Sequence, residues 1–341
     1  MPQAQVDQVL GLAREFFALP LDAKNEISQL KSPQFRGYSR IGGELTNGKV
    51  DWREQIDIGP ERRVIDGAEG YWRLQGPNLW PSTPSGFRAA FEEWDTALSV
   101  VGLRLLRHWA VSLGAAEDTF DPAFTDRPAT LIKVVRYPGT SDTPQGVGTH
   151  KDSGVLTLLV VEPESEGLQV ELSVGEWVDV PPLAGVFIVN IGELLEVATG
   201  GYLRATRHRV LAPQPGSDRV SIPYFLNPSL DALIPVISLP PGWPACPVAS
   251  KPIPTTPSST PTARTRGSRE HALTPTSRNC TTASHRRVWP RPTERRFHRA
   301  DRNRWAARPG PSRFPACSMC AVWPCCRKSS AAARFPRPQH R

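Results

Sequence analysis

Seven short segments between residues 131 and 226 constrain the fold more than any other feature of this sequence. Each is rich in β-branched, aromatic and other apolar residues and is bounded by turn residues, as is typical of strands. They are residues 131–137, 155–161, 167–172, 176–180, 186–190, 205–211 and 220–226. Ser173-Val174-Gly175 is typical of a hairpin turn. Seven short strands after a helical beginning predict a two-sheet barrel or jelly roll rather than a parallel α/β sheet. The expected fold class is therefore mainly β with flanking helices.

The residues before these strands have helical periodicity at both ends. Apolar spacing predicts an amphipathic helix over residues 3–18, and a second short helix is expected over Leu21–Ile27. Residues 32–82 are rich in Gly, Pro and charge, and should form loops with short extended pieces. A long helix is expected to begin at Ser85 as N-cap and to end at Gly114. Its predicted buried residues are Phe87, Phe91, Trp94, Leu98, Val101, Leu105 and Trp109.

The composition of the chain changes abruptly near Gly242. Residues 1–241 contain 21 Lys+Arg and 30 Asp+Glu, whereas residues 242–341 contain 20 Lys+Arg and 3 Asp+Glu. All six cysteines also lie after Gly242. The basic isoelectric point therefore belongs to the tail and does not indicate what the acidic body binds. Because the body has no cysteine, it has no disulfide framework.

No segment has the pattern of a targeting or membrane sequence. Asp7, Arg14 and Glu15 interrupt any apolar run in residues 1–20, which therefore do not resemble a signal peptide. No stretch approaches the ~18 uncharged apolar residues of a membrane span. A cytoplasmic protein without membrane partners is expected, and the sequence carries no signal for an oligomeric state.

Three residues have the identity and spacing of a metal site. His150 and Asp152 are two residues apart, so both side chains can point to the same side of an extended chain. His208 follows several strands later and can supply a third ligand across a barrel. Two imidazoles and one carboxylate make up the facial triad of iron(II) oxygenases, although His-x-Asp alone also fits a surface turn. His108, in the predicted long helix, is interpreted as a surface or helix-packing residue.

Arg219 and Ser221 lie on one side of a predicted strand shortly after His208. A guanidinium binds a carboxylate through two parallel hydrogen bonds, and a nearby hydroxyl adds another. The co-substrate 2-oxoglutarate has such a distal carboxylate, and its keto-acid end can occupy two open iron positions. The alternative, a solvated surface cation, fits less well because Arg219 stands between a turn and an otherwise apolar strand.

These motifs together resemble the bacterial members of the isopenicillin N synthase-like iron(II)/2-oxoglutarate oxygenase family. The resemblance covers roughly residues 2–241, and its motifs occur in the same order as in the family. They are His150-x-Asp152, Gly167-Leu168-Gln169-Val170, Arg207-His208-Arg209-Val210, Arg219-x-Ser221 and Tyr224-Phe225-x-Asn227-Pro228. Phe16-Phe17-x-Leu19-Pro20 and Arg36-Gly37-Tyr38 are similar to the N-terminal region of the family.

The resemblance implies a double-stranded β-helix and assigns roles to individual residues. It makes His150, Asp152 and His208 the ligands of iron(II), and it makes Arg219, Ser221 and Tyr137 the binding residues for 2-oxoglutarate. Trp177, Gly185 and Asn190 are expected to be turn and core residues, and the expected substrate walls are Leu156, Arg204, Phe225 and Asn227.

The implied activity is that of a dioxygenase. It oxidises a small organic substrate with O2 while converting 2-oxoglutarate to succinate and CO2. An ethylene- and succinate-forming activity is the alternative within the same class.

The resemblance also divides the chain into three parts. Residues 1–120 correspond to a helical N-terminal region that is expected to be incomplete, because Met1-Pro2 resembles the end of a family turn. Residues 121–241 correspond to the oxygenase domain, although the closing helices of the family are not recognisable beyond Leu239.

Residues 242–341 form the third part, which is rich in Arg and Pro and lacks helical or strand periodicity. The favoured interpretation is a disordered extension produced by out-of-frame translation. One alternative is a basic nucleic-acid-binding arm, which would make the chain a non-catalytic binding protein. Another is a zinc site formed by Cys317, Cys320, Cys325 and Cys326. Nucleic acid is not expected as a partner.

Overall fold

The computed structural model describes residues 1–240 and 321–324, to which every structural statement below refers. The disorder, nucleic-acid and zinc interpretations of residues 242–341 concern residues outside the described part, apart from one short strand. That strand, β13 (Ala321–Pro324), pairs antiparallel with β10 (Val186–Ile191), a pairing that the sequence did not predict. None of the described helices is long and apolar enough to cross a membrane.

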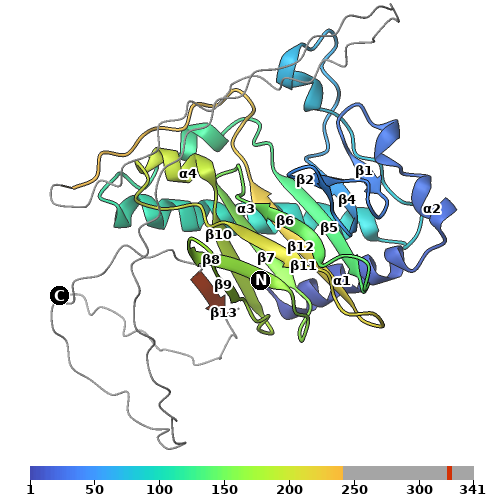
Figure 1. Ribbon diagram of the computed structural model, residues 1–341. Coiled ribbons are helices and arrows are strands. Elements are labelled where there is room, and N and C mark those ends of the chain that lie inside the picture. Colours follow the sequence, from blue (N-terminus) through green and yellow to red (C-terminus); the bar gives the residue numbers. More distant parts are fainter. Residues whose placement is uncertain (241–320, 325–341) are drawn as a thin grey trace, which may run out of the picture. The chain divides into compact units, whose positions relative to one another are not determined.

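The strands form two main sheets and one short ribbon (Figure 1). The seven-stranded major sheet has the order β1-β4-β5-β12-β7-β10-β13, and the four-stranded minor sheet has the order β6-β11-β8-β9. β2 and β3 form the ribbon. The remaining bounds are β1 (Gly37–Ser39), β2 (Leu45–Thr46), β3 (Lys49–Val50), β4 (Glu54–Ile58), β5 (Leu131–Pro138), β6 (Gln145–His150), β7 (Leu156–Val161), β8 (Leu168–Ser173), β9 (Glu176–Asp179), β11 (His208–Leu211) and β12 (Asp218–Leu226).

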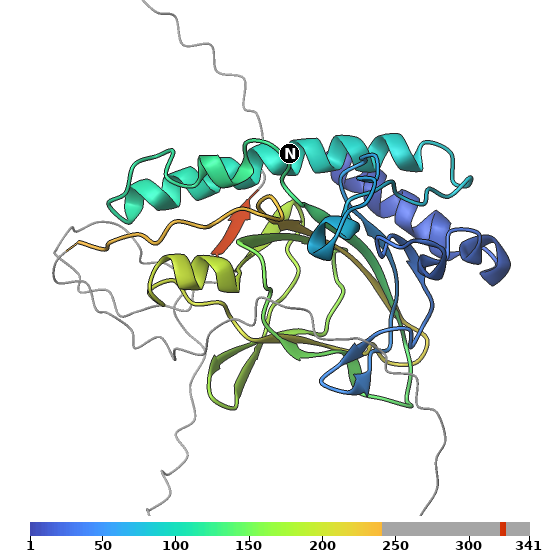
Figure 2. The same ribbon diagram turned by 90° about the horizontal axis from the view of Figure 1, so that it is seen from above.

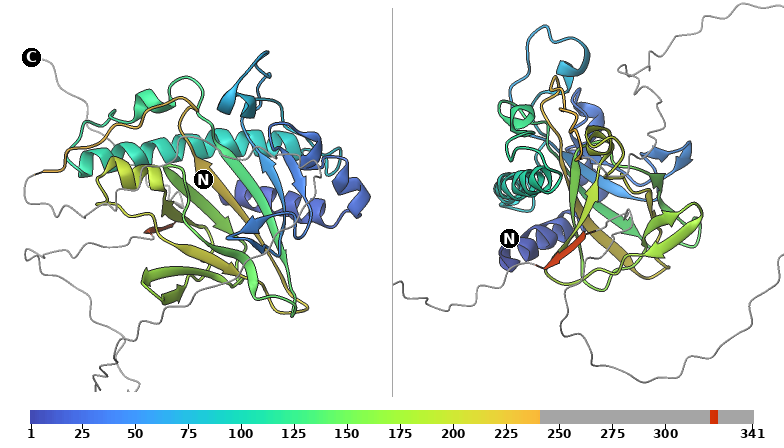
Figure 3. Two further views of the ribbon diagram at one scale, coloured as in Figure 1. Left: turned by 45° about the horizontal axis from the view of Figure 1, so that its top comes forward. Right: turned by 90° about the vertical axis from the view of Figure 1, so that its left-hand side faces the viewer.

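The helices cover the outer face of the major sheet. α1 (Gln3–Phe17) and α3 (Phe87–Ser112) pack against each other and against β12, and Figures 2 and 3 show both helices on one side of the sheet. The other helices are α2 (Leu21–Asn25), η1 (Gln29–Lys31), η2 (Gly70–Leu74), η3 (Asp121–Phe124) and α4 (Glu193–Ala198). The layers are therefore helices, major sheet and minor sheet, as expected for a mainly β jelly roll with flanking helices.

The apolar residues form two separate clusters, one on each face of the major sheet. The larger cluster joins α1 and α3 to the outward-facing side chains of the strands. The smaller cluster lies between the two sheets and consists of Val135, Tyr137, Val147, Leu159, Leu168, Ile188 and Val210. The space between the sheets is thus only partly filled by apolar side chains.

The predicted register of the long helix α3 is correct only in its first half. Phe87, Phe91, Trp94 and Leu98 are buried as expected, but the buried side then continues through Gly102, Leu106 and Ala110. Val101, Leu105 and Trp109 are only partly buried. The small residues allow the sheet to approach, because a Cβ on Gly102 would lie 3.1 Å from Leu226 Cδ2. Because two of the three buried residues, Gly102 and Ala110, are small, the pattern of large apolar residues predicted the neighbouring positions Val101, Leu105 and Trp109 instead.

The predicted N-cap of the same helix is also wrong. Gly86, rather than Ser85, is the N-cap, and no side chain caps the first turn. Gly86 has φ +79°, a left-handed conformation in which glycine is favoured. The backbone turn into the helix therefore takes the place of the expected hydroxyl cap.

All seven predicted segments contain a strand, although β11 begins only at His208. The sequence did not predict β6, whose two glycines and single valine give no clear alternation. Buried Asp51 holds β6 in place, because it accepts hydrogen bonds from Gly148 N (3.1 Å) and Gln145 Nε2 (3.0 Å). This tertiary contact compensates for a weak local preference.

Candidate metal centre

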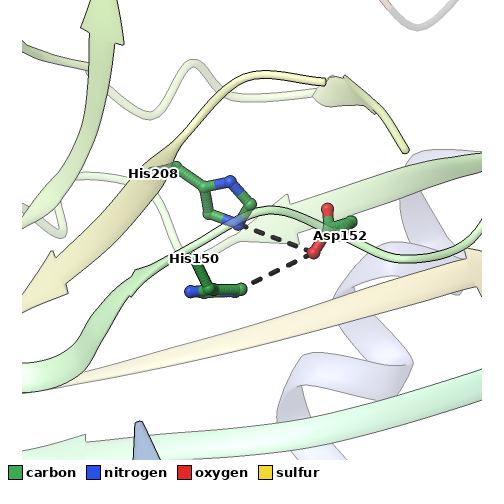
Figure 4. Close-up of side chains that lie close together, drawn as sticks. All are labelled: His150, Asp152 and His208. Carbon is green, nitrogen blue, oxygen red and sulfur yellow. Dashed lines mark ion pairs between the residues drawn. The ribbon is translucent and has the colours of Figure 1, made fainter. Parts of the chain in front are cut away.

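Three side chains from different segments converge at the edge of the space between the sheets (Figure 4). His150 ends β6, His208 begins β11, and the two residues are directly opposite each other in the antiparallel ladder. Asp152 Oδ1 lies 3.6 Å from His208 Nε2 and 3.9 Å from His150 Nε2. One ligand atom from each residue lies within 4.8 Å of the others. The sequence-predicted triad is therefore brought together in space.

Hydrogen bonds orient each of these three residues. The Nδ1–H of His150 donates to the Gly148 carbonyl oxygen (2.8 Å), and that of His208 donates to the Thr206 carbonyl oxygen (3.0 Å). Each bond leaves the Nε2 lone pair directed at the centre. Thr157 donates to Asp152 Oδ2 (2.7 Å), so that Oδ1 faces the imidazoles. Supporting bonds of this kind are characteristic of metal ligands.

The electrostatics of the triad suit a divalent cation. Burial lowers the pKa of His150, and the neighbouring His208 lowers it further, which favours the neutral imidazole that binds metals. Asp152 is only 6% exposed and forms no ion pair with Lys or Arg among the described residues. The buried Asp152 carboxylate therefore lacks a Lys or Arg partner, and a bound metal ion would supply a compensating positive charge.

Helix α4, which the sequence did not predict, ties together the segments that carry the triad. Its Glu196 forms an ion pair with Lys151 (2.7 Å), the residue between His150 and Asp152. The same carboxylate accepts a hydrogen bond from Ala205 N (3.0 Å), just before His208. Glu196 thus positions the triad without belonging to it, and no sequence motif pointed to it.

Arg219 of β12 is a buried cation without an anionic partner among the described residues. Its side chain is 2% exposed, and its Nη1 donates to Ser221 Oγ (3.1 Å). The guanidinium carbon lies 5.0 Å from the centre of the Tyr137 ring, which faces it from β5. The buried Nε has no hydrogen-bond acceptor, and burial lowers the pKa of Arg219. A bound carboxylate would satisfy this guanidinium.

Both groups of residues line one small cavity of about 60 Å³. Its lining includes His150, Asp152 and His208 and also Arg219, Ser221 and Tyr137. The cavity therefore brings together all six residues that the sequence had assigned to metal and co-substrate.

Further polar residues of this cavity were missed or underestimated. Asn190, expected to be a turn or core residue, is buried and lines the cavity opposite Thr157 in the β10–β7 ladder. Arg53 and Lys133 line it as well. A single polar residue within an apolar strand, as in Leu156–Val161 and Val186–Ile191, is a signal that could have identified Thr157 and Asn190.

A second cavity, of about 670 Å³, shares the lining residue Lys133 with the first. Of the predicted substrate walls, Phe225 lines the small cavity and Asn227 the large one. Leu156 points into the helix-facing core because strand side chains alternate, so its prediction as a substrate wall is wrong. Arg204 is exposed and lines neither cavity, and its role stays a prediction.

A network of ion pairs holds the strand that carries Arg219. Arg14 of α1 forms ion pairs with both Glu162 and Asp218, and Arg136 contacts Asp218 at 2.7 Å. Glu162 also accepts a hydrogen bond from Val220 N (2.9 Å). The residues on both sides of Arg219 are thereby fixed from α1.

We predict that Arg14→Ala lowers the free energy of unfolding by about 1–2 kcal/mol, because two partly exposed charge-assisted contacts are lost. The loss depends on pH. Burial opposes the ionised form of Asp218, but the bonds from Arg14 and Arg136 outweigh it and lower its pKa. This contribution is present above the ordinary pKa of about 3.9 and disappears as the pH falls through the lowered value.

Urea unfolding between pH 7 and pH 3 measures this difference. The matched control is Arg88→Ala, which removes an exposed ion pair within α3. Equal stability of Arg14→Ala and wild type at pH 7 would show that the network does not support β12.

Comparison with known proteins agrees with this site. Residues 129–228 match the family model of the 2OG-Fe(II) oxygenase superfamily, and residues 1–83 match the model described as non-haem dioxygenase in morphine synthesis N-terminal. The first match spans the triad and Arg219, and the second spans α1 and the ribbon.

Individual relatives extend over the same part of the chain. A 2-oxoglutarate-dependent dioxygenase of Dothideomycetidae sp. is 36% identical over 253 residues, covering 70% of this chain and 67% of the relative. A homoarginine-6-hydroxylase of Oryza sativa subsp. japonica is 32% identical, covering 67% of this chain and 71% of the relative. Among solved structures, a Neurospora crassa protein in complex with alpha-KG superposes with a TM-score of 0.60 at 27% identity, covering 72% of this chain and 77% of that chain.

Proposed function

Because the chain belongs to the 2OG-Fe(II) oxygenase superfamily, we propose that His150, Asp152 and His208 bind its iron(II) and that Arg219, Ser221 and Tyr137 bind its 2-oxoglutarate. The observation that carries this proposal is the convergence of both groups on one cavity. When bound, iron(II) supplies the activation of O2 by which 2-oxoglutarate becomes succinate and CO2 and a second molecule is oxidised.

The protein's own residues bind and orient the reactants. His150 and His208 present Nε2 because their Nδ1–H groups are held by main-chain carbonyls. Asp152 supplies the negative charge that holds the cation. Arg219 would bind the distal carboxylate of 2-oxoglutarate, with the Ser221 hydroxyl beside it and the Tyr137 ring as a wall. Burial of this clamp excludes water from the co-substrate.

The test is release of succinate from 2-oxoglutarate by the purified chain, supplied with iron(II) and air. Homoarginine is the first small-molecule substrate to try, because a relative is named a homoarginine-6-hydroxylase. We expect slow succinate release without substrate and faster release with one. Absence of any iron-dependent succinate from a folded preparation would contradict the proposed function.

A further inference from the structure

The charged residues of the larger cavity differ in how they are paired. Lys133 Nζ donates to both carboxylate oxygens of Asp57, at 2.9 and 3.0 Å. Arg62 donates to the main-chain oxygens of Arg127 (3.3 Å) and Pro128 (3.0 Å). Glu44 lies 3.9 Å from Arg53. These residues already have partners within the described part of the chain.

Arg36 also lines this cavity, but its guanidinium has no hydrogen bond or ion pair among the described residues. Its Nε is completely buried and has no acceptor. Burial lowers the pKa of Arg36, Arg62 lowers it further, and only Asp57 opposes this shift. The Arg36 side chain as a whole is only partly buried and lines the cavity, so an anionic ligand there could accept hydrogen bonds from its Nη groups and compensate for the partial desolvation of the charge.

The local backbone holds Arg36 in this position. Its N–H donates to Ser32 Oγ (3.1 Å), and the next residue, Gly37, has φ +104° with space for no side chain. A Cβ on Gly37 would lie 2.2 Å from the Ile27 carbonyl oxygen. The guanidinium itself lies against Gly59, where a Cβ would be 2.2 Å from Arg36 Nη2. Two glycines therefore make room for the turn and for the charged group.

We propose that Arg36 binds a carboxylate of the primary substrate, whose remaining atoms extend past Lys133 toward the metal cavity. This inference rests on the proposed function and adds the chemical class of the substrate. The charge balance favours a monoanion. The cavity is lined by the cations Arg36, Arg62 and Lys133 and by the carboxylates Glu44 and Asp57, so one positive charge is in excess. A phosphate dianion would carry more negative charge than the one excess positive charge of the cavity, and it would be repelled by the carboxylates of Glu44 and Asp57.

The experiment compares a carboxylic acid with its own primary amide. Pairs of monoanionic aliphatic and aromatic carboxylic acids and their amides are used, because these acids carry the single negative charge that the cavity would balance. Anaerobic calorimetry with iron(II) and 2-oxoglutarate measures binding, and succinate release measures turnover. Wild type should bind the acid of at least one pair at least about 30-fold more tightly than its amide, as expected for loss of a charge-assisted pair.

Arg36→Gln should remove this preference by weakening binding of the acid, while the Kd of the neutral amide should change by less than about 3-fold. Arg36→Lys should recover only part of it, because an ammonium lacks the planar fork. The matched control is Arg63→Gln, which replaces a nearby exposed arginine and should bind the acid as wild type does. Thermal unfolding of each variant separates lost binding from lost folding.

The inference and the proposed function fail in different ways. Without iron-dependent succinate release from wild type, the proposed function is wrong. The inference about Arg36 is wrong if wild type releases succinate but prefers no acid over its amide. It is also wrong if folded Arg36→Gln keeps the preference for the acid.

Discussion

Replacement of His208 by Ala should reduce affinity for iron(II) by at least about 100-fold and abolish turnover of 2-oxoglutarate. Loss of only a supporting hydrogen bond around a metal already costs about 10–100-fold, and here a ligand itself is lost. His208 is buried, faces Asp152 Oδ1 at 3.6 Å and has no substitute histidine nearby among the described residues. Asp152 would then retain one imidazole partner, which is too few for the facial triad.

The control for this prediction is His108→Ala. His108 lies exposed on α3 and belongs to no metal-binding group, so its loss should change neither iron content nor turnover. Metal analysis after dialysis against iron(II), together with succinate release, measures both quantities. Equal iron content in wild type and His208→Ala would remove His208 from the metal site.

Arg219→Ala should weaken binding of 2-oxoglutarate by about 2–5 kcal/mol, which is a factor of about 30 to several thousand in Kd. The buried guanidinium is the cation of the small cavity that has no carboxylate partner among the described residues, so the distal carboxylate would lose its charged contact. Iron(II) binding should persist because the three ligands are unchanged. Arg219→Lys should restore little, since an ammonium cannot form two parallel bonds.

Anaerobic titration of the iron-loaded protein with 2-oxoglutarate gives these Kd values directly. Arg88→Ala serves as the control, because its side chain is 55% exposed on α3 and does not line the cavity. An unchanged Kd in a folded Arg219→Ala variant would show that another group binds the co-substrate.

Sequence patterns within a few residues predicted most strands and the residue pairs that share one side of a strand, because neighbouring residues alone determine these features. Short segments rich in β-branched and aromatic residues located the strands of the jelly roll, and i, i+2 spacing placed His150 with Asp152 and Arg219 with Ser221 on common sides. β6 escaped prediction because a distant carboxylate, Asp51, stabilises a glycine-containing strand.

The large cavity could not be predicted for a similar reason. Its walls come from stretches that are far apart in the sequence, among them residues 29–36, 57–62, 129–133 and 227–232. Arg36 is left unpaired because Asp57, on β4, pairs with Lys133, which lies opposite it on β5. No single stretch of sequence reveals this pairing. Short motifs describe the proposed metal site, whereas the proposed substrate site depends on tertiary structure.

The alternation along β12 has a consequence for how this protein can change. Arg219, Ser221 and Phe225 face the small cavity and Asn227 faces the large one, while Val220, Ile222 and Leu226 face the helices. Asn227, which follows the last residue of β12, lies eight positions after Arg219, roughly 26 Å for an extended chain at about 3.3 Å per residue. Substitutions at that separation should combine additively. Substitutions at the Asn227 end can therefore be made without retuning the Arg219 end, whereas a one-residue shift in the pairing register of the whole strand would exchange its two faces and disrupt both ends at once.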